Sequence, residues 1–113
     1  MRKESSRSVR ITFPALSREE LVESLRQGVA LLAAELPVCR AVLFGSWASG
    51  RATAFSDIDV LIVYAGSPRD DGFDTVRRYL KLRGIEPHVY SEEEARQIED
   101  TLHRMTLDGI ELL

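Results

Sequence analysis

Residues 43–61 read LFGSWASGRATAFSDIDVL, and this stretch decides the fold that the sequence predicts. A mostly apolar run stops at Gly45, which is typical of a buried strand that meets a turn. The small and polar residues over 46–56 predict a short helix followed by a loop. A second strand, rich in β-branched residues, begins at Ile58, between Asp57 and Asp59. The stretch therefore predicts two central strands joined by a turn that carries polar groups.

The flanking sequence predicts further helices and a third strand. Apolar residues at helical spacing follow capping-box patterns twice in the chain. The resulting order is helix, strand, short helix, strand, helix, strand and helix. We therefore expect an α/β (α+β) domain in which helices pack on one face of a mixed sheet. The predicted flanking elements are helices over 17–36, 73–82 and 91–108 and a strand over 85–90.

The composition predicts one folded domain spanning residues 1–113. The chain has 44% apolar and 29% charged residues, as ordinary globular proteins do. Its longest apolar stretch, 60–65, is far shorter than the roughly 20 residues that span a bilayer. We expect a cytoplasmic protein, because the N-terminus lacks the apolar run of a secretory signal. A membrane partner is not expected.

The net charge of −3 disfavours a protein whose main activity is to coat nucleic acid. Four basic residues within residues 1–10 form either a flexible basic tail or an arm that binds nucleic acid. We favour the tail, because chain termini are often poorly ordered. Nucleic acid therefore stays a less favoured partner.

The turn at Gly45 and Ser46 is predicted to bind phosphate. A strand that ends in Gly-Ser and enters a helix presents backbone N–H groups and a hydroxyl to an anion. Gly45 allows close approach to the backbone, while Ser49 and Arg51 add a donor and a positive charge nearby. These four residues are the candidate nucleotide-binding residues.

Asp57 and Asp59 are the candidate metal ligands. Side chains alternate along a strand, so both carboxylates point to one face about 7 Å apart. Two such anions beside a triphosphate would repel it unless a divalent cation lay between them, and Mg²⁺ prefers oxygen ligands. Glu86 on the third strand is either a third metal-binding acid or a solvated side chain. His88, on the same face, either orients an acceptor or packs.

The glycine–serine turn followed by paired aspartates resembles the motif of the DNA polymerase beta nucleotidyltransferase superfamily, in particular its minimal members. The resemblance covers about residues 39–90. It implies that Gly45-Ser46 contacts the triphosphate and that Asp57 and Asp59 bind two Mg²⁺ ions. An acid on the following strand would complete the set. The family commonly has aspartate there, whereas here Glu86 is the residue that fits.

The expected reaction is Mg²⁺-dependent transfer of a nucleoside monophosphate to an acceptor hydroxyl. ATP is the favoured nucleoside triphosphate, so the transferred group is AMP. Some minimal members of the superfamily are antitoxins that adenylylate a partner toxin, which makes a protein a possible acceptor. The short chain also suggests that a partner protein or a second copy presents the acceptor.

Two alternatives remain open at this stage. The first is a catalytically inert binding module that keeps the nucleotidyltransferase fold and pairs with a helical partner protein. The second is an adaptor whose basic first residues bind nucleic acid. An intact pair of aspartates argues against the first alternative.

Overall fold

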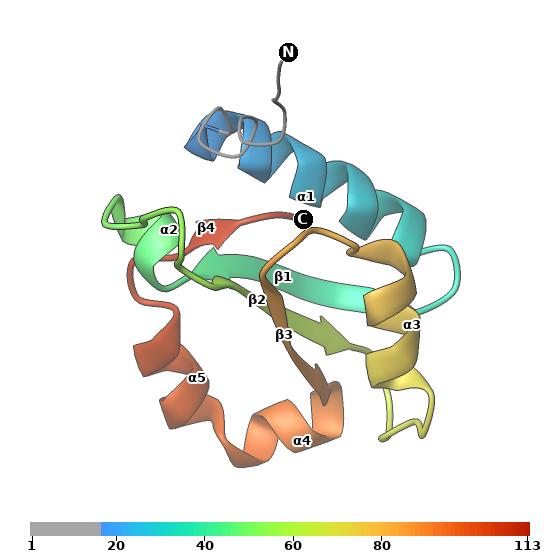
Figure 1. The fold of residues 1–113 in the computed structure, drawn as a ribbon. Helices are drawn as coiled ribbons and strands as arrows, with labels where there is room; N and C mark the ends of the chain where they lie inside the picture. The colour runs from blue at the N-terminus through green and yellow to red at the C-terminus, as the bar shows by residue number, and fades with distance from the viewer. Residues whose placement is uncertain (1–16) are drawn as a thin grey trace.

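The computed structural model describes residues 17–113, which form one sheet and five helices (Figure 1). The predicted basic tail over residues 1–10 lies outside this range. None of the helices between residues 17 and 113 is long and apolar enough to cross a membrane. In chain order the elements are α1 (Arg18–Leu32), β1 (Val38–Phe44), α2 (Ser46–Ser49), β2 (Ile58–Tyr64), α3 (Gly72–Tyr79), β3 (Ile85–Ser91), α4 (Glu92–Gln97), α5 (Glu99–Met105) and β4 (Ile110–Glu111).

Two capping boxes open α1 and α4, as the sequence predicts. The Ser17 hydroxyl accepts a hydrogen bond from the Glu20 N–H at 3.0 Å, and Glu20 Oε1 accepts one from the Ser17 N–H at 2.9 Å. Ser91 and Glu94 repeat the same exchange at 3.0 and 2.8 Å. Each box pairs backbone N–H groups that a helix start would otherwise leave without partners. The positions where these helices begin are therefore fixed by local sequence.

The four strands form a mixed sheet in the order β3-β2-β1-β4. Strand β1 is antiparallel to both β2 and β4, while β2 and β3 are parallel. A parallel pair needs a crossover between its strands, and α3 lies in that connection. The predicted mixed α/β sheet is confirmed. Its two central strands, β1 and β2, are the ones that flank the Gly45 turn.

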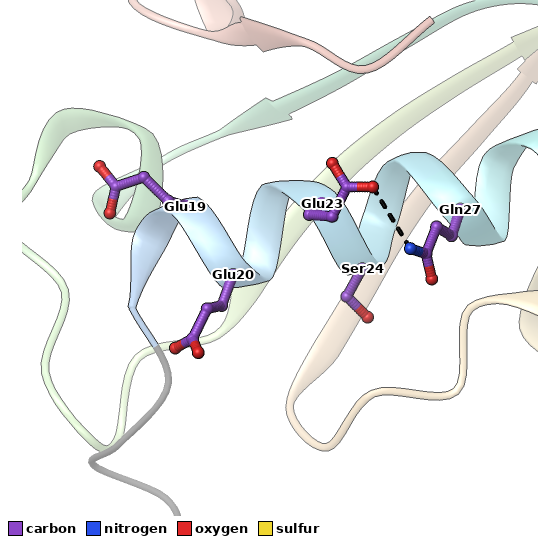
Figure 2. A pocket seen from close by; sticks show the side chains of 5 residues that line it. All are labelled: Glu19, Glu20, Glu23, Ser24 and Gln27. Atoms are coloured by element: carbon purple, nitrogen blue, oxygen red, sulfur yellow. Dashed lines mark hydrogen bonds between the residues drawn. The ribbon is translucent and has the colours of Figure 1, made fainter.

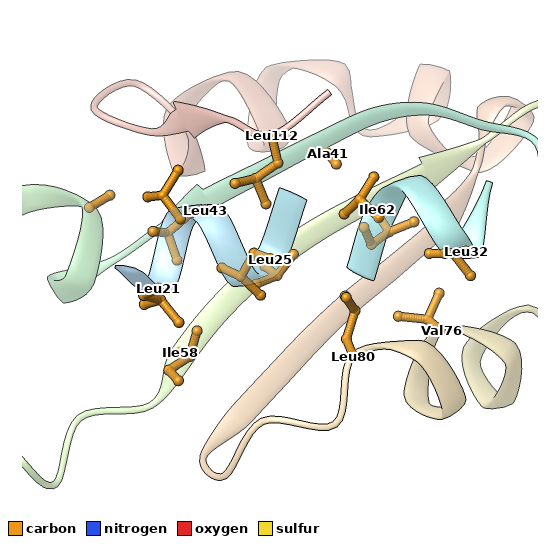
Figure 3. Packing of buried hydrophobic residues seen from close by; sticks show 14 of the residues in the cluster. Leu21, Leu25, Leu32, Ala41, Leu43, Ile58, Ile62, Val76, Leu80 and Leu112 are labelled. Atoms are coloured by element: carbon orange, nitrogen blue, oxygen red, sulfur yellow. The ribbon is translucent and has the colours of Figure 1, made fainter. Parts of the chain in front are cut away.

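The main core lies between the sheet and helices α1 and α3 (Figure 3). The α1 residues Leu21, Leu25 and Leu32 have no exposed surface. Their spacing of four and seven residues places them on one face of the helix. They point toward strand residues such as Leu43 and Ile62, which are also fully buried (Figure 3). Burial of this apolar face therefore fixes α1 across the sheet.

Helices α4 and α5 lie on the opposite face of the sheet (Figure 1). A second cluster forms there, in which Leu102 of α5 packs with Val42, Phe44, Leu61 and Val63 of the central strands. The fold class is as predicted, but the prediction that helices pack on one face only is wrong. Apolar side chains of β1 and β2 point to both faces of the sheet, so both faces need to be covered by helices.

Truncation of Leu25 should test the main core. Leu25→Ala removes a fully buried side chain and is expected to lower the free energy of unfolding by about 2–5 kcal/mol. Leu31, on the same helix, is 64% exposed, so Leu31→Ala should change the free energy of unfolding by less than about 0.5 kcal/mol. Urea unfolding of both variants measures the difference. Equal costs would contradict the burial pattern of α1.

Candidate active site

The Gly45 turn joins the end of β1 to the short helix α2. Gly45 has φ of +78° and ψ of −154°, a conformation that is almost restricted to glycine. The Ser49 N–H donates to the Gly45 carbonyl at 3.1 Å, which closes the single turn of α2. No side chain of the described residues caps the start of this helix. Its first N–H groups and the Ser46 hydroxyl therefore lie at a corner directly after the strand.

Asp59 lies against this corner. It pairs with Phe44 in the antiparallel ladder of β1 and β2, one residue before Gly45. A Cβ atom added to Gly45 would lie 2.6 Å from Asp59 Oδ2, closer than real Cβ contacts allow. The structure thus brings the predicted phosphate-binding turn and one predicted metal-binding carboxylate into direct contact. Glycine at position 45 is needed both for its φ angle and for this contact.

His88 of β3 is the other neighbour of Asp59. Its Nε2 lies 3.3 Å from Asp59 Oδ1, and the two side chains are 31% and 27% exposed. The imidazole also meets the Phe44 ring edge-on, with ring centroids 5.0 Å apart. The sequence leaves two roles open for His88, one that orients an acceptor and one that only packs. The structure places it in the candidate site, with its ring beside an apolar neighbour and a nitrogen toward a carboxylate.

Asp57 and Glu86 are exposed. Asp57 directly precedes the first residue of β2, whose N–H donates to the Gly84 carbonyl at 2.8 Å. Glu86 is the β3 partner of Asp59 in the parallel register, so both lie at the same level of the sheet. Within residues 17–113, no group of three or more acidic, histidine or cysteine side chains is close enough to hold a metal ion. The predicted acids are therefore neighbours along the strands and not a closed cluster.

Ser49 and Arg51 lie on the exposed side of the same turn. The Ser49 hydroxyl donates to the Ser46 carbonyl at 3.2 Å and accepts from Arg51 Nε at 3.1 Å. Gly50 between them has φ of +82°. Ser49 thus holds the Arg51 side chain beside α2, so the predicted positive charge lies close to the predicted phosphate-binding corner.

Arg18 supports the corner from α1. Its Nη1 donates to the Ala48 carbonyl at 2.9 Å and so ties the first residue of α1 to α2. Trp47 packs against the main core, and its buried Nε1 has no hydrogen-bond partner among the described residues. The sequence does not predict the Arg18 contact, because an arginine at a helix start forms no local pattern with a residue 30 positions away.

The loop before Asp57 is held by its own hydrogen bonds. The Ser56 hydroxyl accepts from the Thr53 N–H at 2.9 Å, and the Ser56 N–H donates to the Thr53 carbonyl at 3.1 Å. The Phe55 N–H donates to Thr53 Oγ1 at 3.2 Å, and the Phe55 ring is 96% exposed. Ser56 therefore positions the loop that leads to the aspartates.

Two hollows of the surface lie elsewhere. One is a shallow depression on the exposed side of α1, where Gln27 donates to Glu23 across one helical turn (Figure 2). The other, about 710 Å³, lies near the start of β1 and the end of β2, beside α4 and α5. Cys39 is exposed, and partial desolvation of its thiol, together with the charge of Glu92, raises the pKa of the thiol. Neither hollow is lined by a predicted site residue. The first is lined by Glu19, Glu20, Glu23, Ser24 and Gln27.

Comparison with known proteins gives the class to which this fold and site belong. The family model described as nucleotidyltransferase domain matches residues 21–112. The chain therefore belongs to the nucleotidyltransferase domain family, and the predicted assignment as a nucleotidyltransferase is confirmed. Domains of this family generally use divalent metal ions.

A solved structure supports the fold. A protein from Sulfolobus solfataricus, proposed to be a nucleotidyltransferase and solved at 1.40 Å resolution, is similar with a TM-score of 0.59. The two are 23% identical, and the match covers 83% of this chain and 80% of that chain. At this identity the likeness concerns the fold. Among curated proteins, no relative matches this sequence.

Proposed function

We propose that this chain transfers AMP from ATP to an acceptor hydroxyl and releases pyrophosphate. The observation that carries the proposal is the contact between the Asp59 carboxylate and the Gly45 backbone. A group that binds phosphate and a group that binds metal must be adjacent if both act on one triphosphate. The acceptor oxygen would bond to the α-phosphorus while the bond to the pyrophosphate oxygen breaks.

Each predicted residue has a part in this proposal. Gly45 and Ser46 would bind the triphosphate through backbone N–H groups and the hydroxyl, with Ser49 and Arg51 adding hydrogen bonds and positive charge. Asp57 and Asp59 carry the oxygen ligands that suit Mg²⁺, and two Mg²⁺ ions bound there would supply the positive charge that phosphoryl transfer needs. Glu86 would assist at the attacking oxygen, because it lies beside Asp59 in the strand register. These carboxylates are therefore the oxygen donors that would hold the divalent ions that the family generally uses.

A partner protein is the proposed acceptor, as in pairs of a toxin and an adenylylating antitoxin. The described part of the chain is one small sheet with its helices, and the turn beside Asp59 is open. An acceptor would then be brought by another molecule, either a partner or a second copy of this chain. Arg51 and Phe55, both exposed in the segment that follows α2, are residues that such a partner would meet.

Calorimetry tests the binding step. ATP should bind the wild-type protein in the presence of Mg²⁺, and the variant with Asp57→Asn and Asp59→Asn should lose this Mg²⁺-dependent binding. The control is the same titration without Mg²⁺, in which wild type and variant should behave alike. Unchanged Mg²⁺-dependent binding in the double variant would contradict the proposed site.

Transfer is tested with ATP that carries a radioactive α-phosphate. Incubation with lysate from the source organism should yield a labelled protein band that the double aspartate variant does not produce. If a small molecule is labelled instead of a protein, the acceptor is a small molecule. Binding of ATP without any labelled product would favour the inert binding module.

A further inference from the structure

Asp59 lies between two neighbours at the centre of the candidate site. Its Oδ2 lies against the Gly45 backbone, and its Oδ1 lies 3.3 Å from Nε2 of His88. Within residues 17–113, His88 is the only hydrogen-bond partner of this carboxylate. An ionised carboxylate only accepts hydrogen bonds, so the hydrogen atom of this contact is on Nε2. His88 therefore donates to one carboxylate oxygen while the other oxygen lies at the Gly45 corner.

This hydrogen bond selects the direction in which the Asp59 side chain points. The side chain is 27% exposed, so packing leaves it room to rotate between staggered positions. Rotation away from the observed position would take Oδ2 off the Gly45 backbone. At 3.3 Å the bond is slightly longer than the usual range of about 2.7–3.2 Å. We therefore expect it to orient the carboxylate more than to stabilise the fold.

The imidazole of His88 is itself supported by the Phe44 ring. The two rings meet edge-on, with centroids 5.0 Å apart and planes at 60°. Phe44 is buried in the second cluster, so it is a fixed support. It is also the residue before Gly45 and the ladder partner of Asp59. The contacts thus run in a closed circuit from Gly45 through Phe44, His88 and Asp59 back to Gly45, and this circuit couples the carboxylate to the turn.

We propose that His88 is a positioning residue, which holds Oδ2 of Asp59 against the Gly45 corner by donating a hydrogen bond to Oδ1. Glu86, the register partner of Asp59, is exposed and does not make this contact. The inference rests on the proposed function, because the place of the carboxylate matters to activity only if the Gly45 corner binds a triphosphate. Loss of the bond should then lower the transfer rate roughly 10–100-fold, as expected when a group that orients a functional side chain is removed.

Two substitutions separate the hydrogen bond from the packing of the ring. His88→Phe keeps a ring beside Phe44 but has no hydrogen-bond donor. His88→Gln has no ring, but its side-chain amide N–H can donate to Asp59 as Nε2 does. The affinity for ATP with Mg²⁺ and the rate of AMP transfer should fall roughly 10–100-fold in His88→Phe and stay close to the wild-type values in His88→Gln. If His88 only packed, His88→Gln would be the more damaged of the two.

Crystal structures of the two variants test the position of the carboxylate directly. Oδ2 of Asp59 should leave the Gly45 corner in His88→Phe and stay there in His88→Gln. Urea unfolding gives the folded fraction of each variant, so that rates are compared per folded molecule. His103, an exposed residue of α5, is the second of two histidines in the chain, and His103→Gln should match the wild type in every measurement.

The outcomes distinguish this inference from the proposed function. A wild-type transfer rate in His88→Phe, equal losses in both His88 variants, or an unmoved carboxylate in the His88→Phe structure would overturn the positioning role. If Asp59→Asn still lowers transfer in that case, the inference fails and the proposed function stands. If Asp59→Asn leaves both ATP binding and transfer at the wild-type level, the proposed function fails as well.

Discussion

Replacement of Asp59 with asparagine should lower the rate of AMP transfer roughly 10²–10³-fold, the loss expected when one electrostatic group is removed from an active site. The Asp59 carboxylate lies against the Gly45 corner on one side and His88 on the other. Asparagine has nearly the same shape but no charge, so the cation would lose a central ligand. The initial rate of label transfer from radioactive ATP to the acceptor measures the effect.

The fold should survive this substitution. The amide of Asp59→Asn can still contact His88, and the free energy of unfolding should change by about 1 kcal/mol or less. Asp74 is an exposed acid in the first turn of α3, and Asp74→Asn should leave the transfer rate within a factor of about two. Glu86→Gln should give a transfer rate between that of Asp59→Asn and that of Asp74→Asn. A rate for Asp59→Asn equal to that of Asp74→Asn would contradict the proposed site.

Local sequence was sufficient to predict the elements around the site. The capping boxes at Ser17 and Ser91 fix helix starts through contacts within four residues. The apolar runs before Gly45 and after Asp59 form the two central strands. The antiparallel pairing of β1 with β2, which the structure adds, then brings the turn and Asp59 together at one end of the sheet.

Contacts that depend on strand register could not be predicted in this way. Glu86 and His88 share one face of β3, and sequence alternation does not say which of them meets Asp59. In the parallel register Asp59 is the partner of Glu86 and Leu61 is the partner of His88, yet the His88 side chain is the one that reaches the Asp59 carboxylate and meets the Phe44 ring. The predicted last helix is likewise divided at Ile98, where the chain turns between α4 and α5. That turn lets α5 cover the second face of the sheet.

Replacement of Gly45 with alanine should damage both stability and activity. The φ of +78° and ψ of −154° at Gly45 would strain an alanine by about 1–3 kcal/mol. In addition, the new Cβ would lie 2.6 Å from Asp59 Oδ2, so either the carboxylate or the turn must move. Since transfer depends on that carboxylate, we expect the rate per folded molecule to fall at least roughly 10²-fold, as for a misplacement of about 1 Å.

Two other glycines separate backbone strain from the collision with Asp59. Gly50 has φ of +82°, and a Cβ there would lie 3.8 Å from Arg18 Nη1, an ordinary contact; at Gly66, with φ of +93°, it would meet nothing within 4 Å. Gly50→Ala and Gly66→Ala should therefore cost about 1–2 kcal/mol of stability through left-handed strain while the folded protein keeps its transfer rate. Urea unfolding and the transfer rate, measured on the same samples, separate the two effects. Suppose that Gly45→Ala loses stability and still transfers AMP as fast as Gly50→Ala does. In that case transfer does not require the Asp59 carboxylate to lie against the Gly45 turn, and the proposed function loses the contact on which it depends.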